Sequence, residues 1–279
     1  MIHQRDAVLR LLRDDDPSTL ELVKQQLAKR GVGALEELRV LLGSADPVSA
    51  AHILDVVNEI EMRETDTIFG QLCASFDEHG DIEDAAWRLA ATFMPDSDFG
   101  EDRRLLDRWG SEVTHRLRKA ASSRDRIETL VEFLAHELRF HGNADDYYNI
   151  NNSLLPEVIQ TRAGIPITLS LVYILVGKRA GLTVHGVGLP GHFIIRHGED
   201  FFDPFGEGRR IGLEECRWLV AHHGMALSAH HLLPITPRQM LVRILGNIHA
   251  IAEPRDPPLA EKVAGWIASL RSDRQATST

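Results

Sequence analysis

The side chains with the clearest capacity for chemistry are one histidine and one aspartate, His192 and Asp203. His192 opens the β-type run His192–Arg196, and Asp203 ends the run Asp200–Asp203. Glycine-rich turns separate these runs, which predicts an antiparallel meander. We therefore expect the imidazole and the carboxylate to face each other in a cleft. Such a pair can bind a carbonyl or an amide side chain, or act as a general base for water.

A helix and one further β-type run must position this pair. The run Thr183–Leu189 precedes His192, and the amphipathic segment Ile165–Ala180 precedes that run. A Gly-Ile-Pro sequence opens the segment and Gly181 closes it. Proline at the first helical positions loses no hydrogen bond, and glycine just past a helix can adopt the left-handed cap. This stretch therefore predicts one helix followed by a small antiparallel sheet.

Four short motifs, taken in order, carry a resemblance to a known family: Gly164-Ile165-Pro166, Gly181-Leu182, Gly191-His192 and Asp203-Pro204. The chain resembles the transglutaminase-like superfamily, a papain-related fold with a Cys-His-Asp triad. The flanking sequence is more closely similar to a bacterial branch, the Sir-B type transglutaminase-like core proteins. The resemblance covers residues 82–251. It implies a core in which a central helix packs on a small antiparallel sheet, with His192 and Asp203 as two members of the triad.

One departure from the resembled family decides the expected chemistry. Where the resemblance requires the nucleophilic cysteine, this chain has Pro166, which carries no acidic or nucleophilic atom. The resemblance implies that members of the Sir-B type branch lack this cysteine as well. Our leading hypothesis is a catalytically silent transglutaminase-like protein that acts as a binding or regulatory module, with His192 and Asp203 as a relic dyad.

An enzymatic alternative stays open. It is a hydrolase or acyl-transferase that uses His192 and Asp203 with water or with Ser170. Ser170 would lie about one helical turn beyond the nucleophile position and is expected to face the core. Cys216 fits a buried apolar position on a helix, and Cys73 belongs to a different segment. We therefore favour the silent protein over the enzyme.

Polar residues ahead of the central helix are the candidate ligand contacts. Asn152, Ser153 and Glu157 match a motif of the resembled branch, Asn-Ser followed by Glu. Their short helix is expected to lie beside the central helix and near the cleft. We predict that these residues, together with Ser170, form a polar rim that contacts a ligand.

A purely structural role for the same residues is an equally weighted alternative. Ser153 would then cap the short helix, and Glu157 would form a salt link with Arg162 or Arg179. The preceding segment, Phe140–Tyr148, has no periodicity and is expected to be a loop. Its polar and aromatic residues would line the same cleft or hold the loop in place: Asp145, Asp146, Tyr147 and Tyr148.

Histidines are frequent late in the chain, which raises the question of a zinc site. They include two adjacent pairs: His222, His223, His230, His231 and His249. Adjacent residues on a helix point about 100° apart, so such a pair does not readily chelate one ion. The spacings typical of zinc sites on one helix and an accompanying cysteine pair are both absent. We expect no metal and no cofactor.

Composition narrows the classes of partner. The chain has 279 residues and a net charge of −10, which argues against direct binding to nucleic acid or to an anionic membrane. No segment approaches the roughly 18 apolar residues of a membrane helix, and the N-terminal sequence lacks a signal-peptide core. Two cysteines far apart in sequence favour a reduced cytoplasmic protein. A protein or peptide is the expected partner, and the oligomeric state is left open.

The whole chain predicts an α+β protein with three consecutive parts. Residues 1–95 form a helical domain with Asp-Pro breaks similar to those of HEAT-like repeats, although we favour a plain helical domain. Residues 96–235 form the transglutaminase-like core, led by a hairpin of two helices, Phe99–Lys119 and Arg124–Arg139. Residues 236–279 form a short C-terminal tail with a helical pair and a polar end.

The helical N-terminal half also carries a third functional hypothesis. Its apolar spacing predicts a series of short helices, among them Val48–Met62 and Thr65–Phe76. In this hypothesis the helices form a protein-interaction scaffold. Large exposed apolar area on residues 1–95 would favour it.

Overall fold

Helices account for most of the chain, and its contacts divide it into two compact units. The computed structural model describes residues 2–14 and 16–272. Unit 1 comprises the chain up to Gln71 together with Arg88–Ser97, and unit 2 comprises Leu72–Trp87 together with the chain from Asp98 onward. The domain boundaries predicted after residues 95 and 235 stay predictions.

Unit 1 is a helical body with its own hydrophobic core. Its first elements are α1 (Ile2–Leu11), α2 (Pro17–Ala28), η1 (Gly31–Ala34) and α3 (Leu35–Leu42). Helix α2 begins where the carboxylate of Asp16 accepts hydrogen bonds from the backbone nitrogens of Ser18 and Thr19. Apolar residues spaced three or four apart supply the core, including Leu12, Leu38, Leu41, Ile53 and Val56.

One long helix takes the place of two predicted ones. Helix α4 runs without interruption over Pro47–Ser75, so the prediction of separate helices at Val48–Met62 and Thr65–Phe76 is wrong. The residues between them, Arg63 and Glu64, are favourable helix formers, and neither a glycine nor a proline stands at this junction. The HEAT-like repeat stays a prediction.

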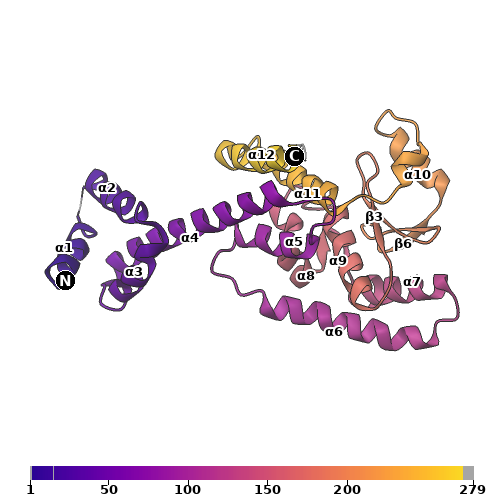
Figure 1. Cartoon of the computed structure of the whole chain (residues 1–279), viewed down its shortest axis with the longest axis horizontal. Helices are drawn as coiled ribbons and strands as arrows, with labels where there is room; N and C mark the ends of the chain where they lie inside the picture. The colour runs from indigo at the N-terminus through magenta and orange to yellow at the C-terminus, as the bar shows by residue number, and fades with distance from the viewer. Residues whose placement is uncertain (1, 15, 273–279) are drawn as a thin grey trace, which may run out of the picture. The chain divides into compact units, whose positions relative to one another are not determined.

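Unit 2 is organised around α9 (Pro166–Arg179), the predicted central helix. Most of its residues are buried, which is why its sequence is apolar on nearly every side. Helix α6 packs along α9, and the strands contact α9 as well (Figure 1). Helix α5 (Ile82–Ala91) belongs to this unit as far as Trp87. The further helices of this unit are α6 (Gly100–Arg116), η2 (Leu117–Lys119), α7 (Ser123–Val131), α8 (Leu155–Thr161), α10 (Leu213–Ala221), η5 (Ala229–Leu232), α11 (Pro237–Ala252) and α12 (Pro257–Arg271).

The predicted leading hairpin is present, with a change in its second helix. After α7 the chain continues as a π-helical segment, η3 (Glu132–Glu137), before it turns at Arg139, which has a φ of 61°. The capping box that starts α7 is formed by Ser122 and Asp125. A π-helical segment has the same apolar pattern as a helix over so short a length, so the sequence cannot distinguish the two.

The sheet is the predicted antiparallel meander, with one additional strand. Its order is β3 (His185–Val187), β4 (Ile194–His197), β5 (Asp200–Asp203) and β6 (Arg209–Ile211). A separate parallel pair joins two short segments, β1 (His141–Gly142) and β2 (Ala163–Gly164). Strand β6 was not predicted, because Arg209–Ile211 shows two exposed arginines and only one apolar residue. The fold is α+β, with a helical N-terminal half and a short C-terminal helical tail.

Among the residues that the structure describes, no helix is both long enough and apolar enough to cross a membrane.

Candidate functional site

His192 and Asp203 lie beside each other at one end of the meander, and the cleft predicted around them stays a prediction. The Nε2 atom of His192 lies 3.0 Å from Oδ1 of Asp203, and the two side chains are 14% and 7% exposed. Asp203 is the last residue of β5. His192 precedes β4 instead of lying on it, because Gly191 adopts a φ of 69° and places the histidine in the turn. The two residues thus meet where one strand begins and its neighbour ends.

The contact between them is electrostatic in its geometry. The distance between Nε2 and Oδ1 is short enough for an ion pair, but the angle at Nε2 does not meet the geometry of a hydrogen bond. This buried nitrogen has no other hydrogen-bond partner among the described residues. Asp203 is fixed by its own turn: its Oδ1 accepts from the backbone nitrogen of Phe205 at 3.1 Å, and its carbonyl accepts from Gly208 at 2.8 Å. The carboxylate is therefore held in place, and the imidazole is the freer member.

No nucleophile occupies the start of α9. Ile165 is the N-cap residue and Pro166 is the first residue of the helix, and both are buried. Proline suits this position because its missing N–H would have no partner within the helix. Thr168, two residues after Pro166, uses its hydroxyl as a donor to the carbonyls of Asn152 and Ile165.

The hydroxyl of Ser170 is not engaged with the dyad. Ser170 is fully buried, and its Oγ atom makes no hydrogen bond to His192 or to any other described residue. A buried hydroxyl without a partner costs about 1–3 kcal/mol of desolvation. A ligand would reach Ser170 only if the packing of α9 opened, so its predicted role as a ligand contact stays a prediction.

Replacing Ser170 by alanine should stabilise the protein. We expect Ser170→Ala to raise the free energy of unfolding by about 1 kcal/mol, because it removes an unsatisfied buried hydroxyl at little cost in volume. Urea unfolding measures this change. The matched control is Thr168→Val, which removes a neighbouring buried hydroxyl that has partners and should destabilise by about 1 kcal/mol. A loss of stability in Ser170→Ala would contradict the absence of a partner.

The two cysteines are also unsuited to nucleophilic chemistry. Both are free and buried. Burial raises the pKa of Cys73 to about 12. Burial, with further contributions from the charges of Glu215 and Asp203, raises the pKa of Cys216. A thiol with a raised pKa is protonated and poorly nucleophilic near neutral pH.

Asn152 is a structural junction beside the start of α9. Its Oδ1 accepts from the side-chain amide of Asn143 at 2.9 Å, and its Nδ2 donates to the carbonyls of Asp146 at 2.6 Å and Tyr147 at 3.2 Å. Its own carbonyl accepts from the Thr168 hydroxyl at 2.5 Å. Asn152 thus joins the loop before it to the central helix.

Removing the Asn152 side chain should release this loop. We expect Asn152→Ala to lower the free energy of unfolding by about 2–3 kcal/mol, because it removes the hydrogen bonds that the buried Asn152 side chain makes to Asn143, Asp146 and Tyr147. Hydrogen exchange should also show faster exchange over residues 143–149. The control is Asn149→Ala on the same loop, whose side chain is bonded only within its own turn. Equal protection of the loop in Asn152→Ala and the wild type would contradict this role.

Two of the predicted alternatives for the neighbouring residues are wrong. Leu154, and not Ser153, is the N-cap residue of α8, and the Ser153 hydroxyl is buried without a partner. No ion pair joins Glu157 to an arginine in the described chain. Arg162 lies over the ring of Trp109 at 4.5 Å, and Arg179 is engaged elsewhere, with carboxylates on α5 and α6. The contacts of Arg162 and Arg179 depend on which helices pack against them, and the sequence around Glu157 does not specify that packing.

Aromatic side chains gather next to the dyad. The ring of Phe205 lies 6.4 Å from that of His192 and 5.9 Å from that of Tyr147, with edge-to-face geometry in both cases. Tyr148 packs on Tyr147 and is 66% exposed. Phe205 thus lies between Tyr147 and His192, and the predicted role of the loop residues at a cleft stays a prediction. Sequence reasoning missed Phe205, although it directly follows the Asp203-Pro204 motif.

A second residue missed from the sequence is Arg243 on α11. Its Nη2 atom donates to the backbone carbonyls of Leu189 at 2.9 Å and His192 at 3.0 Å. It thereby fixes the backbone that carries the histidine. Nothing local in the sequence marks this role, because Arg243 lies in a separate helix of the C-terminal part.

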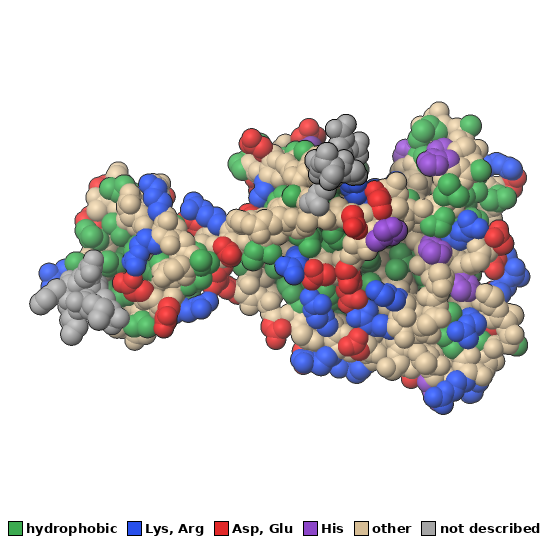
Figure 2. All heavy atoms as spheres, viewed as in Figure 1, with side chains coloured by type: hydrophobic (Ala, Val, Ile, Leu, Met, Phe, Trp, Pro, Cys, Tyr) green, Lys and Arg blue, Asp and Glu red, His purple; other side chains and the backbone are tan. Residues whose placement is uncertain are grey.

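The described residues contain no group of three or more histidine, cysteine, aspartate or glutamate side chains that could hold a metal ion. Figure 2 shows histidine side chains spread over the part of unit 2 that carries the sheet and α10. The ring of His223 lies against the backbone of Gly191, where a Cβ atom would come within 1.7 Å of its Nε2. That histidine is a packing neighbour of the turn before His192.

Known proteins share this core but not the whole chain. A "UPF0162 protein" of Xylella fastidiosa is 37% identical over 45% of this chain and 48% of its own length. "UPF0162 protein PA3419" of Pseudomonas aeruginosa is 29% identical over 64% of this chain and 67% of its own length. "F-box only protein 21" of Mus musculus is 30% identical over 46% of this chain and 22% of its own length. The chain thus spans about half the length of the first curated relatives it matches. No solved structure matches it.

One family match covers the region described above. Residues 101–246 match the family described as Transglutaminase-like superfamily. This segment runs from α6 through the dyad and into α11, and it makes up more than half of the 279 residues. The chain therefore belongs to the transglutaminase-like superfamily.

Proposed function

We propose that this protein is a transglutaminase-like binding module without thiol chemistry, whose ligand contacts the surface around His192 and Asp203. The observation that carries the proposal is a His-Asp pair with no hydroxyl or thiol hydrogen-bonded to the histidine anywhere in the described chain. Acyl transfer requires a nucleophile within hydrogen-bond reach of the base. The start of α9, where the resemblance to the transglutaminase-like superfamily puts the thiol, holds Pro166.

The chemistry of this surface fits a peptide or protein partner. His192, Phe205, Tyr147 and the exposed Tyr148 present aromatic rings beside a carboxylate. Tyrosine and phenylalanine bury large area at low cost in side-chain entropy, and the imidazole can hydrogen-bond an amide. A region similar to part of this chain makes up about a fifth of a longer protein named for an F-box, which supports a role as a module.

A regulatory role of the Sir-B type and a cytoplasmic location belong to the same proposal. Both cysteines are free and buried in the structure, which supports a reducing compartment.

The first test asks whether the chain turns over an amide. A short glutamine-containing peptide with hydroxylamine as acceptor should give no hydroxamate and no ammonia with the wild type. Turnover that disappears in His192→Ala would show that the protein is a hydrolase or acyl-transferase, with water as the nucleophile available to the dyad.

The second test measures binding. Selection from a random-peptide library on the whole chain should enrich peptides whose affinity falls at least tenfold in Phe205→Ala. Trp218→Ala is the matched control, because Trp218 is an exposed aromatic residue on α10 outside the dyad. Equal binding by Phe205→Ala and the wild type would place the ligand elsewhere on the molecule.

A second candidate function rests on unit 1. Most of the large apolar side chains that are exposed in the described chain lie in this unit: Leu11, Leu22, Val32, Val40, Val48, Leu54, Met62 and Ile68. Such side chains support a protein-interaction scaffold where they form a contiguous patch. Replacing Leu22, Val40 and Val48 together by serine should then abolish partner capture and leave the fold of unit 1 unchanged by circular dichroism.

A further inference from the structure

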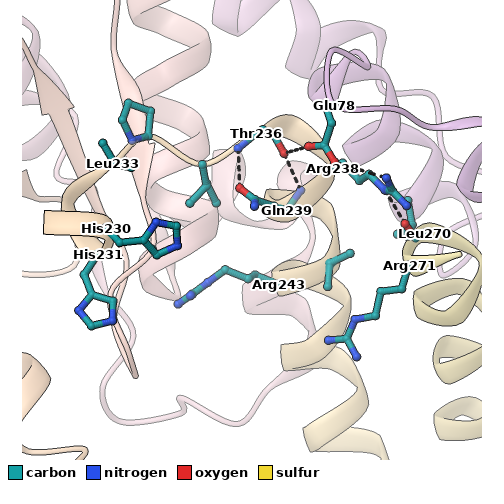
Figure 3. Close-up of a pocket in the computed structure, with 14 residues that line it drawn as sticks. Glu78, His230, His231, Leu233, Thr236, Arg238, Gln239, Arg243, Leu270 and Arg271 are labelled. Atoms are coloured by element: carbon teal, nitrogen blue, oxygen red, sulfur yellow. Dashed lines mark hydrogen bonds and ion pairs between the residues drawn. The ribbon is translucent and has the colours of Figure 1, made fainter. Parts of the chain in front are cut away.

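Unit 2 contains a basic pocket that the transglutaminase-like dyad does not use. The pocket has a volume of about 680 Å³ and opens among the segment His230–Thr236, the first turns of α11 and the end of α12 (Figure 3). No motif in the sequence marked it, because its lining comes from separate elements.

One wall of the pocket is a closed ion-pair network. The carboxylate of Glu78 accepts from the Thr236 hydroxyl and lies 3.4 Å from Nη1 of Arg238. The remaining donors of Arg238 go to the carbonyls of Leu270 and Ser272. Glu78 and Arg238 therefore satisfy each other, and Glu78 is the only acidic residue of the described lining.

Arg243, unlike Arg238, lines the pocket without an acidic partner among the described residues. Its Nη2 donates to two backbone carbonyls, Leu189 and His192, and its guanidinium lies 5.5 Å from the ring of Phe193. Burial lowers the pKa of Arg243. A Cβ atom at Gly188 would lie 2.9 Å from Nη1, so the glycine makes room for the guanidinium. No carboxylate pairs with this arginine among the described residues, which leaves a partly desolvated positive charge facing the pocket.

A second uncompensated arginine completes the arrangement. Arg271 is exposed at the end of α12 and has no ion pair within the described chain. Figure 3 shows Arg243 extending from α11 toward the segment that carries His230 and His231, and Arg271 extending from the end of α12 with its guanidinium group apart from that of Arg243. Guanidinium forks bind the oxygens of carboxylate and phosphate groups in pairs, and imidazole adds further donors.

We propose that this pocket binds a small oxyanion, the carboxylate or phosphate group of a soluble ligand, with Arg243 and Arg271 as the positively charged groups of its lining. A chain of net charge −10 repels anions in general. Two guanidinium groups that lack acidic partners in the described chain make the electrostatic potential locally positive in this pocket. The test below changes Arg271, which contacts neither His192 nor Asp203 in the described chain, so this proposal and the one for the dyad can fail separately.

Calorimetric titration of the whole chain tests the site, with inorganic phosphate and succinate as probes and potassium chloride holding the ionic strength constant. We expect saturable binding of one equivalent of at least one probe, weakened about fivefold or more in Arg271→Gln. The matched control is Arg118→Gln, an exposed arginine of η2 outside the pocket, which should change the affinity less than about twofold. The stronger probe identifies which oxyanion the pocket prefers.

Two results would overturn the proposal. One is the absence of saturable binding by either probe up to about 20 mM, which corresponds to less than about 2–3 kcal/mol of binding free energy. The other is equal weakening in Arg271→Gln and Arg118→Gln, which would indicate a general effect of net charge. Arg271 is exposed, so its replacement should leave the thermal unfolding midpoint unchanged and keep the comparison valid.

Discussion

Replacing Gly110 by leucine should lower the free energy of unfolding by about 3 kcal/mol or more. Gly110 lies on the face of α6 that packs against α9, and even a Cβ atom there would come within 2.3 Å of the Cβ of Arg179. Real atoms do not approach so closely, so the two helices must separate to admit the larger side chain. Overpacking of a well-packed interface costs about 1–3 kcal/mol, and the loss of apolar contact along α6 and α9 adds to this.

Urea unfolding followed by circular dichroism measures the Gly110→Leu effect. The matched control is Gly246→Ala on α11, where a Cβ atom would meet nothing within 4 Å. A glycine in an open helical position costs about 0.5–1 kcal/mol relative to alanine, so this control should stabilise the protein slightly. A loss below about 1 kcal/mol in Gly110→Leu would mean that α6 does not pack closely on α9 in solution.

Arg179→Met should lower the free energy of unfolding by about 2–3 kcal/mol. Arg179 donates from two nitrogens to the two carboxylate oxygens of Glu83, at 2.6 and 2.9 Å, and from Nε to Asp107 at 2.7 Å. Burial lowers the pKa of Arg179, but its hydrogen bonds and charge interactions with Glu83 and Asp107 have the larger combined effect, so the pKa is raised overall. Removing one partner of a partly buried pair leaves the other charge desolvated and unpaired. Glu83 is 15% exposed, so it would suffer most of that cost.

The control for Arg179→Met is Arg116→Met. Arg116 also pairs with two carboxylates, Glu112 and Glu137, but these lie at the surface. Exposed ion pairs contribute about 0–1 kcal/mol, so this variant should be nearly neutral. Similar losses in the two variants would show that burial does not set the value of the pair at Arg179. High salt should reduce the Arg116 effect more than the Arg179 effect.

Local sequence was sufficient for the elements that carry the dyad. The Gly-Ile-Pro start and Gly181 end of α9 were predicted to within a residue or two, because proline and glycine restrict φ wherever they occur. Three of the four strands of the meander were predicted for the same reason, since turn glycines separate them. Their order then brings His192 beside Asp203, at 3.0 Å.

Local sequence failed where an element's neighbours decide its role. Ser153 has the residue type of a helix cap, yet Leu154 takes that position. Arg162 and Arg179 were candidate partners for Glu157, yet one lies on aromatic rings and the other joins Glu83 and Asp107. Each of these choices depends on which helix faces the side chain, and that is a property of packing.

What the sequence by itself determined is the α+β class, the central helix, the meander and the identity of its histidine and aspartate. Those features follow from apolar periodicity and from backbone restrictions that act within a few residues. Only the tertiary structure decided that Phe205 lies between Tyr147 and His192, that Arg243 holds the backbone of His192, and that Arg243 and Arg271 share a pocket. These residues come from distant parts of the chain, and contacts between such parts arise from the packing of complete helices and strands, which no short stretch of sequence specifies.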